Sequence, residues 1–336
     1  MLETRRVPGS LIFAGDEGVG KRLFALELAK AVLCQQTVDN EACDVCASCV
    51  RISKFPAFPV PDDKHRDEYK KVFWSEHPDV GTVIPYKNTI LVDAVRNLVD
   101  ESNFTPYEGK ARFFLIDEAD KLNSSNDSAA NALLKTLEEP APTTHLILLT
   151  ARPNFLLQTI RSRCQIIRFA PIASEDIETY LAKDSVASKK VSPNDAKLLA
   201  RISRGSIGKA LSTNLDSYKQ QREQMLGVLE SLAAKPDRAR LLKIAEDLND
   251  AKIKDEYEKR LEILQILIHD VWSIRLGSED IVNSDLQTKL AKLAETTQSV
   301  RAQSWLTEIE TLRETLVVNV NRKIATDALF MKMASA

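Results

Sequence analysis

Residues 15–22 read Gly-Asp-Glu-Gly-Val-Gly-Lys-Arg and directly follow a short apolar run over residues 11–14. The stretch matches the phosphate-binding pattern G-x-x-x-x-G-K-[ST] at every fixed position except the last. In that pattern backbone N–H groups surround the phosphates, the lysine reaches the β- and γ-phosphates, and the final hydroxyl binds Mg²⁺. The stretch therefore predicts a strand, a phosphate loop and a helix, which together open a nucleotide-binding α/β fold.

The last position of this loop departs from the pattern. The residues that the loop retains are Gly15, Gly18, Gly20 and Lys21. Arg22 stands where serine or threonine is expected, and a guanidinium cannot ligate Mg²⁺. Because charge neutralisation in phosphoryl transfer depends on that ion, we expect ATP and Mg²⁺ to be bound poorly or not at all. The alternative interpretation is a plain glycine-rich turn.

The composition is that of a folded globular protein. The chain has 336 residues, of which 44% are hydrophobic and 28% charged, and this length allows two or three domains. No apolar run reaches about 18 residues and the first residues lack a signal core, so we expect a cytoplasmic protein without a membrane span. The net charge of −2 argues against a surface that coats nucleic acid. Contact with DNA would therefore need a local patch or partners.

Four of the five cysteines are closely spaced in the pattern C-x₈-C-x₂-C-x₂-C. They are Cys34, Cys43, Cys46 and Cys49. In a cytosolic protein such a cluster indicates a metal site rather than disulfides. Four thiolates suit a tetrahedral Zn²⁺ with no open position, which predicts one structural zinc per chain. An iron–sulfur cluster is the alternative.

An acidic motif follows a later apolar run. Residues 113–116 read Phe-Phe-Leu-Ile, and Asp117 and Glu118 come next. In phosphate-loop ATPases an aspartate in this place lies near Mg²⁺, and a glutamate can orient the attacking water. We predict these roles for the two carboxylates, in an intact or a relic form. Capping of the next helix is the alternative interpretation.

Short apolar strands alternate with helices as far as Pro171. The predicted strands cover residues 11–14, 81–85, 113–116, 146–150 and 165–169. This alternation predicts a parallel sheet with helices on both faces. Beyond Pro171 the strand patterns stop, and apolar residues recur at helical spacing, as in Leu261, Leu264, Ile268 and Val271.

This change of pattern predicts three domains. We expect an α/β domain over residues 1–171, a small helical lid over 172–215 and a helical collar or oligomerisation domain over 216–336. The α/β domain would contain the cysteine module, 34–49, and a surface insertion over 54–76 that is rich in proline and charge.

Ser162-Arg163-Cys164 lies between a predicted helix and the last strand. At this edge of the α/β domain Arg163 would be able to reach a nucleotide held by a neighbouring chain. An arginine finger supplied in trans accelerates hydrolysis roughly 10³- to 10⁵-fold. The alternative is an ordinary surface arginine beside a buried cysteine. The tripeptide alone would favour this alternative, whereas the surrounding motifs favour the arginine finger.

Taken in order, these motifs resemble the clamp-loader branch of the AAA+ superfamily, and in particular the stator subunits of bacterial DNA polymerase III. The other segments that carry the resemblance are HPDV at 77–80, TPYEG at 105–109, FLIDEAD at 114–120, NALLKTLEEP at 131–140 and TIRSRC at 159–164. Together the motifs span most of residues 5–170, and the resemblance is weak beyond residue 210.

The resemblance implies a RecA-like AAA+ domain, a helical lid and an all-α collar that joins a pentameric loader. The implied partners are gamma/tau-like and delta-like loader subunits, a sliding clamp and primed DNA, with no membrane. It also implies that Arg163 acts on ATP held by the adjacent subunit and that Thr150 occupies the sensor-1 position. The implied location is the bacterial cytoplasm, at the nucleoid when the loader is assembled.

Two departures from the motor subunits of that family bear on function. The motors carry serine or threonine after the loop lysine and a sensor-2 arginine in the lid, whereas this chain has Arg22 and Gly208. Arg204 and Lys209 are the candidates to replace the missing arginine. The departures favour a subunit that does not hydrolyse ATP itself. The alternatives are an active gamma/tau-like ATPase and a zinc-containing DNA-binding scaffold.

Overall fold

The computed structural model describes residues 7–37, 39–123, 127–183, 191–233, 238–248, 256–278, 280–316 and 321–335. The chain divides into two compact units, which are described separately below. The first is Met1–Ile172 with Gly205–Lys209, and the second is Ala173–Arg204 with Ala210–Ala336. The three-domain division with boundaries at 171 and 215 stays a prediction.

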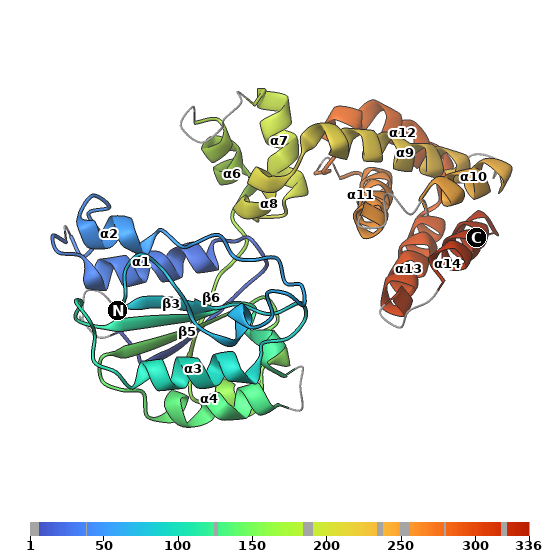
Figure 1. The fold of residues 1–336 in the computed structure, drawn as a ribbon. Helices are drawn as coiled ribbons and strands as arrows, with labels where there is room; N and C mark the ends of the chain where they lie inside the picture. The colour runs from blue at the N-terminus through green and yellow to red at the C-terminus, as the bar shows by residue number, and fades with distance from the viewer. Residues whose placement is uncertain are drawn as a thin grey trace. The chain divides into compact units, whose positions relative to one another are not determined.

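A six-stranded sheet forms the centre of the first unit, with the strand order β2-β3-β4-β5-β1-β6 (Figure 1). The strands are β1 Ser10–Ala14, β2 Phe73–Trp74, β3 Val80–Val83, β4 Arg112–Ile116, β5 Thr144–Thr150 and β6 Gln165–Arg168. All pairs are parallel except β2 with β3. The predicted parallel sheet is confirmed. Its antiparallel edge strand β2 comes from the insertion and was not predicted.

Helices cover both faces of this sheet (Figure 1). On one face lie α1 Lys21–Leu33 and α2 Ala47–Ile52, and on the other α3 Val92–Ser102 and α4 Ser128–Glu138. The shorter elements are η1 Glu68–Lys70, η2 Ala119–Asn123, η3 Pro153–Phe155 and α5 Gln158–Arg161. Because side chains alternate along a strand, Leu11 and Phe13 of β1 pack in the core beneath α1, whereas Ile12 packs in the core beneath α3 and α4.

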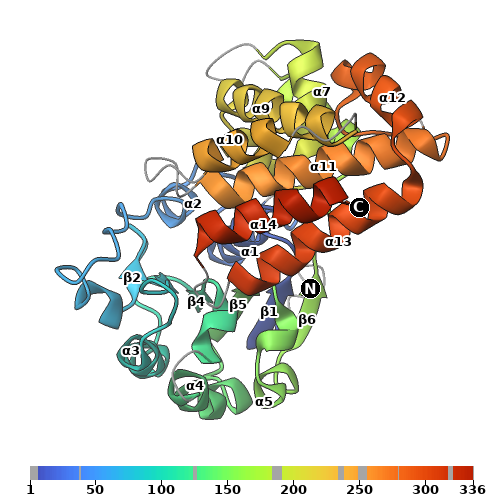
Figure 2. The ribbon, with the colours of Figure 1, turned by 90° about the vertical axis from the view of Figure 1, so that its right-hand side faces the viewer.

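The part of the chain after the sheet is helical in every described element. Its helices are α6 Ser174–Leu181, α7 Pro193–Ile202, α8 Ile207–Ser212, α9 Leu215–Ala233, α10 Arg238–Leu248, α11 Tyr257–Arg275, η5 Ser284–Leu286, α12 Gln287–Thr296, α13 Ser299–Leu316 and α14 Arg322–Ser335. Helix α11 packs against α9, α12 and α13, and α14 lies beside α13 (Figure 2).

The apolar face predicted on α11 is confirmed as core, because Leu261, Leu264, Ile268 and Val271 are all buried. In the same core the indole Nε1 of Trp305 donates a hydrogen bond to the carbonyl of Met333 at 2.8 Å. The all-helical C-terminal region is therefore confirmed. Within the described ranges, no helix has both the length and the apolar content to cross a membrane.

Two of the quoted motifs meet in a buried polar network of the first unit. The carboxylate of Asp79 is fully buried and accepts hydrogen bonds from three backbone N–H groups of residues 107–109, at 2.7, 3.1 and 2.8 Å. The buried guanidinium of Arg112 donates to the carbonyl of Glu101 at 2.5 Å. The HPDV and TPYEG motifs therefore hold the loop before β4 in place, which is a structural role.

Two histidines of the first unit are shielded from water, and Nε2 of one of them, His77, lies 3.1 Å from a carboxylate oxygen of Glu108. His77 is fully buried and accepts a hydrogen bond at Nδ1 from the backbone N–H of Asp79 at 3.2 Å. His145 stacks on Phe113 with the ring centroids 4.8 Å apart. Burial lowers the pKa of both imidazoles below the usual value of about 6.5.

These histidines predict that the protein loses stability in mild acid. The unfolded chain binds the two protons more readily than the folded protein, so this part of the stability is complete above about pH 6.5 and is lost as the pH falls. We expect the urea midpoint to fall between about pH 7 and about pH 5. In His145→Phe, which keeps a stacked ring that cannot titrate, the midpoint should fall less. An equal fall in both proteins would contradict a role for His145.

Candidate functional site

The phosphate loop between β1 and α1 is closed by hydrogen bonds of its own. Gly18 and Gly20 have φ angles of 75° and 100°, which glycine adopts without strain. The Nζ atom of Lys21 donates to the carbonyl oxygens of Gly15 and Asp16, at 2.6 and 2.7 Å. Burial lowers the pKa of this amine. The lysine that would reach a phosphate is therefore engaged within the loop.

A second segment, which contains the Gly208 predicted to stand in place of a sensor-2 arginine, packs on this loop. The backbone N–H of Gly208 donates to the carbonyl of Gly18 at 2.9 Å. A Cβ atom at Gly18 would lie 2.3 Å from the Oγ atom of Ser206, so the approach depends on glycine. Ile207 and Gly208 are the residues of this segment that line the cavity beside the loop. Gly208 thus brings its backbone, and no cationic side chain, to the cavity.

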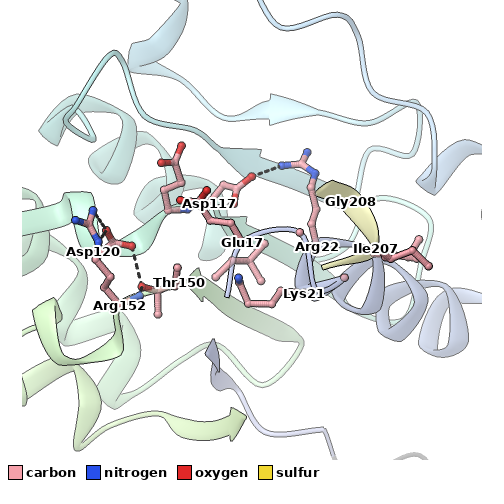
Figure 3. A pocket seen from close by; sticks show the side chains of 15 residues that line it. Glu17, Lys21, Arg22, Asp117, Asp120, Thr150, Arg152, Ile207 and Gly208 are labelled. Atoms are coloured by element: carbon pink, nitrogen blue, oxygen red, sulfur yellow. Dashed lines mark hydrogen bonds and ion pairs between the residues drawn. The ribbon is translucent and has the colours of Figure 1, made fainter. Parts of the chain in front are cut away.

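The guanidinium of Arg22 is paired with the carboxylate that was predicted to lie near Mg²⁺. Its Nη1 atom lies 2.9 Å from Oδ2 of Asp117 (Figure 3). Its Cζ atom also lies 5.2 and 5.3 Å from the ring centroids of Phe55 and Phe58, both from the insertion. A resident cation thus neutralises Asp117. The two aromatic contacts were not predicted.

The other polar residues near the loop are also paired within the chain. Glu118 forms an ion pair with Lys121 at 2.7 Å. The hydroxyl of Thr150 donates to Asp120 at 2.8 Å and accepts the backbone N–H of Arg152 at 2.9 Å. The guanidinium of Arg152 donates to Asp120 from Nε and Nη2, at 3.0 and 2.6 Å. Asp120 ends the quoted FLIDEAD motif but was not among the predicted site residues.

A cavity of about 380 Å³ joins these groups (Figure 3). Its lining includes Lys21 and Arg22 of the loop, the carboxylates of Asp117 and Glu118, and Thr150, which was predicted to occupy the sensor-1 position. This volume is within the range of small-ligand pockets. The residues predicted to act at a nucleotide are therefore brought together. Their functional roles stay predictions.

Arg163 lies at another edge of the sheet. It lies two residues before the start of β6, whereas the phosphate loop follows β1, and these two strands are parallel neighbours. The arginine is therefore at the amino ends of the strands and the loop at their carboxyl ends. The guanidinium of Arg163 donates to the carbonyl of Thr159 and to Oε1 of Glu138, both at 2.8 Å. The pair with Glu138 was not predicted.

The four clustered cysteines have the geometry of a metal site. The sulfurs of Cys34, Cys43, Cys46 and Cys49 all lie within 4.8 Å of one another. Cys34 Sγ is 3.5 Å from Cys43 Sγ and 3.9 Å from Cys46 Sγ. A tetrahedral ion with metal–sulfur bonds of about 2.3 Å needs sulfurs about 3.8 Å apart. The described sulfurs therefore fit such an ion.

The local structure supports this cluster from both sides. Cys34 directly follows α1, and Cys46 directly precedes α2. The backbone N–H of Gln36 points at Cys34 Sγ at 3.3 Å, and that of Cys46 points at Cys43 Sγ at 3.3 Å. Such donors stabilise thiolates that carry negative charge. The four residues are therefore arranged as ligands.

Comparisons with known proteins agree with this arrangement of motifs. The family described as DNA polymerase III, delta subunit, matches residues 1–173, and its C-terminal family matches residues 216–332. The DNA polymerase III subunit delta' of Bacillus subtilis (strain 168) is 30% identical over 305 residues, which cover 90% of this chain and 84% of that protein.

Two further relatives show how widely the similarity extends. DNA polymerase III subunit delta' of Escherichia coli (strain K12) is 30% identical over 329 residues, which cover 96% of this chain and 88% of that protein. DNA polymerase III subunit tau of Bacillus subtilis (strain 168) is 30% identical over 267 residues, which cover 79% of this chain and 43% of that protein.

Proposed function

The chain belongs to the DNA polymerase III delta' family, and from this premise we propose that it is a clamp-loader subunit that does not hydrolyse ATP itself. It occupies one position in a ring with gamma/tau-like and delta-like subunits. It supports the ATP-dependent loading of a sliding clamp onto primed DNA in the bacterial cytoplasm. Arg163 acts as an arginine finger on ATP that the adjacent subunit holds.

The pairing of Arg22 with Asp117 carries the non-hydrolysing part of this proposal. A guanidinium at 2.9 Å occupies the carboxylate that would otherwise support Mg²⁺, and Arg22 itself replaces the hydroxyl ligand. Because Mg²⁺ bridges and neutralises the phosphates during transfer, its loss removes the main source of charge stabilisation. The closed loop around Lys21 supports the same conclusion. Asp117, Glu118 and Thr150 then keep the shape of an ATP site without its chemistry.

The cysteine cluster supports a second, separate proposal, a structural zinc. Zinc accepts four thiolates in a closed tetrahedral site, and the described sulfurs have that spacing. With all four positions taken by the chain, the metal would order residues 34–49 and take no part in catalysis. Cys34, Cys43, Cys46 and Cys49 are its proposed ligands.

Two measurements test the proposed function. We expect the isolated chain to show no steady Mg·ATP hydrolysis, while a motor subunit with serine or threonine after its loop lysine, as positive control, turns over. We also expect native mass spectrometry to place one copy of the chain in a hetero-oligomer with gamma/tau-like and delta-like subunits. Brisk turnover by the isolated chain would indicate an active gamma/tau-like ATPase. Failure to enter any hetero-oligomer would favour a zinc-containing DNA-binding scaffold.

A further inference from the structure

The insertion over residues 54–76 is fixed to the α/β unit at several points. At its base, the backbone N–H of Glu76 donates to the carbonyl of Lys54 at 2.8 Å. Near its far end, the carboxylate of Asp63 accepts hydrogen bonds from the hydroxyl of Tyr86 at 2.6 Å and from Lys87 at 3.0 Å. Strand β2 joins the insertion to the sheet. The segment is therefore a built part of the first unit.

A series of aromatic contacts leads from the sheet to the phosphate loop. The ring of Phe73, in β2, lies 5.4 Å from that of Phe58, centroid to centroid, in an edge-to-face arrangement. Phe58 lies 6.2 Å from Phe55, which packs against the core beneath α1. Phe73 is supported in turn by Tyr69 at 5.6 Å. Both rings that contact Arg22 are thus supported by packing, Phe58 by Phe73 and Phe55 by the core beneath α1.

We propose that the insertion holds the Arg22 guanidinium on Asp117, and that Phe55 and Phe58 are the positioning residues. The insertion thereby keeps the arginine cation where a divalent ion would bind, so that the loop cannot take up metal-bound nucleotide. This inference rests on the proposed loss of metal binding and does not depend on the role of Arg163.

The contacts around Arg22 explain how two rings and one carboxylate hold its guanidinium in place. An aromatic face attracts a cation within about 6 Å of its centroid, and arginine uses this contact more often than lysine. Both rings lie inside that distance, and Asp117 supplies the opposite charge. An arginine without the rings would still reach Asp117 but would be free to leave it. The rings therefore determine how long the carboxylate stays covered.

The test compares two double variants of the full-length chain. Phe55→Leu/Phe58→Leu keeps apolar bulk but removes both aromatic faces, whereas Phe55→Tyr/Phe58→Tyr keeps the faces. The reaction of Arg22 with phenylglyoxal is followed by peptide mass spectrometry, with the exposed Arg96 as internal reference. We expect the leucine variant to react about fivefold faster, the factor that corresponds to about 1 kcal/mol of lost cation–π attraction. The tyrosine variant should stay within about twofold of the wild type.

Circular dichroism and the urea midpoint show whether each variant is folded, and the single variant Phe58→Leu, at the more exposed ring, replaces the leucine double variant if that one is not. Equal Arg22 reactivity in folded leucine and tyrosine variants would overturn the proposal that the two rings hold Arg22 in place. Mn²⁺ in the presence of ADP provides a second readout, because the leucine variant should bind it more tightly than the wild type. Unchanged Mn²⁺ affinity would overturn the exclusion of metal. Both readouts use the isolated chain, so they are separate from any failure of Arg163 in the assembled loader.

Discussion

Replacement of Arg163 by alanine in the assembled loader is expected to slow ATP hydrolysis at the neighbouring site by about 10³-fold or more. The guanidinium would stabilise the charge that develops on the transferred phosphoryl group, and alanine supplies nothing in its place. The measurement is DNA-stimulated hydrolysis in a complex whose other ATP sites carry alanine at the phosphate-loop lysine. In such a complex only the site that this chain serves contributes to the rate.

Two matched variants separate a finger from a structural arginine. Arg161→Ala removes a guanidinium two positions earlier and should leave hydrolysis nearly unchanged. Glu138→Gln removes the carboxylate that pairs with Arg163 within the chain, at 2.8 Å, and should not slow hydrolysis, because the finger must leave Glu138 to reach a neighbour. If Arg163→Ala leaves the rate unchanged in a complex that native mass spectrometry shows to be intact, the finger role is wrong.

The fold of the first unit was predictable because its signals are local. Apolar runs such as residues 113–116 and 146–149 are entirely buried in β4 and β5, and a fully buried parallel strand needs little more than such a run. The loop glycines and the cysteine spacing are equally local. Their geometry follows from a few adjacent residues, and in the structure the loop lines one cavity and the four cysteine sulfurs lie together.

The contacts that the sequence did not reveal all join residues far apart in the chain. Arg22 meets Phe55 and Phe58, and Arg163 meets Glu138. Prolines and charges in the insertion indicate a surface segment, but composition does not determine which residue an aromatic ring of that segment will cover. The sequence signal for the contacts with Arg22 was the presence of two phenylalanines beside three prolines. Apolar rings in a polar segment are expected to pack against another part of the protein.

Removal of the proposed zinc is expected to unfold the cysteine module while the sheet persists. Binding of structural zinc to short modules is worth about 10–16 kcal/mol at neutral pH, and that free energy is folding free energy when the site does not form without the ion. Among the described residues of 34–49, Asp44 forms an ion pair with Lys30 of α1 at 2.9 Å, and α2 packs on α1. We therefore expect Cys46→Ser to raise hydrogen exchange throughout the module.

Elemental analysis is the direct measurement, and it should give about one zinc per chain in the wild type and little in Cys46→Ser. Cys164→Ser provides the matched control, because Cys164 lies outside the cluster and burial raises the pKa of its thiol to about 12. That control should keep its zinc and its protected module. Iron with visible absorbance, or folded wild-type protein without metal, would contradict the zinc assignment. Loss of zinc without faster exchange would show instead that the module is ordered by its packing on α1 and not by the ion.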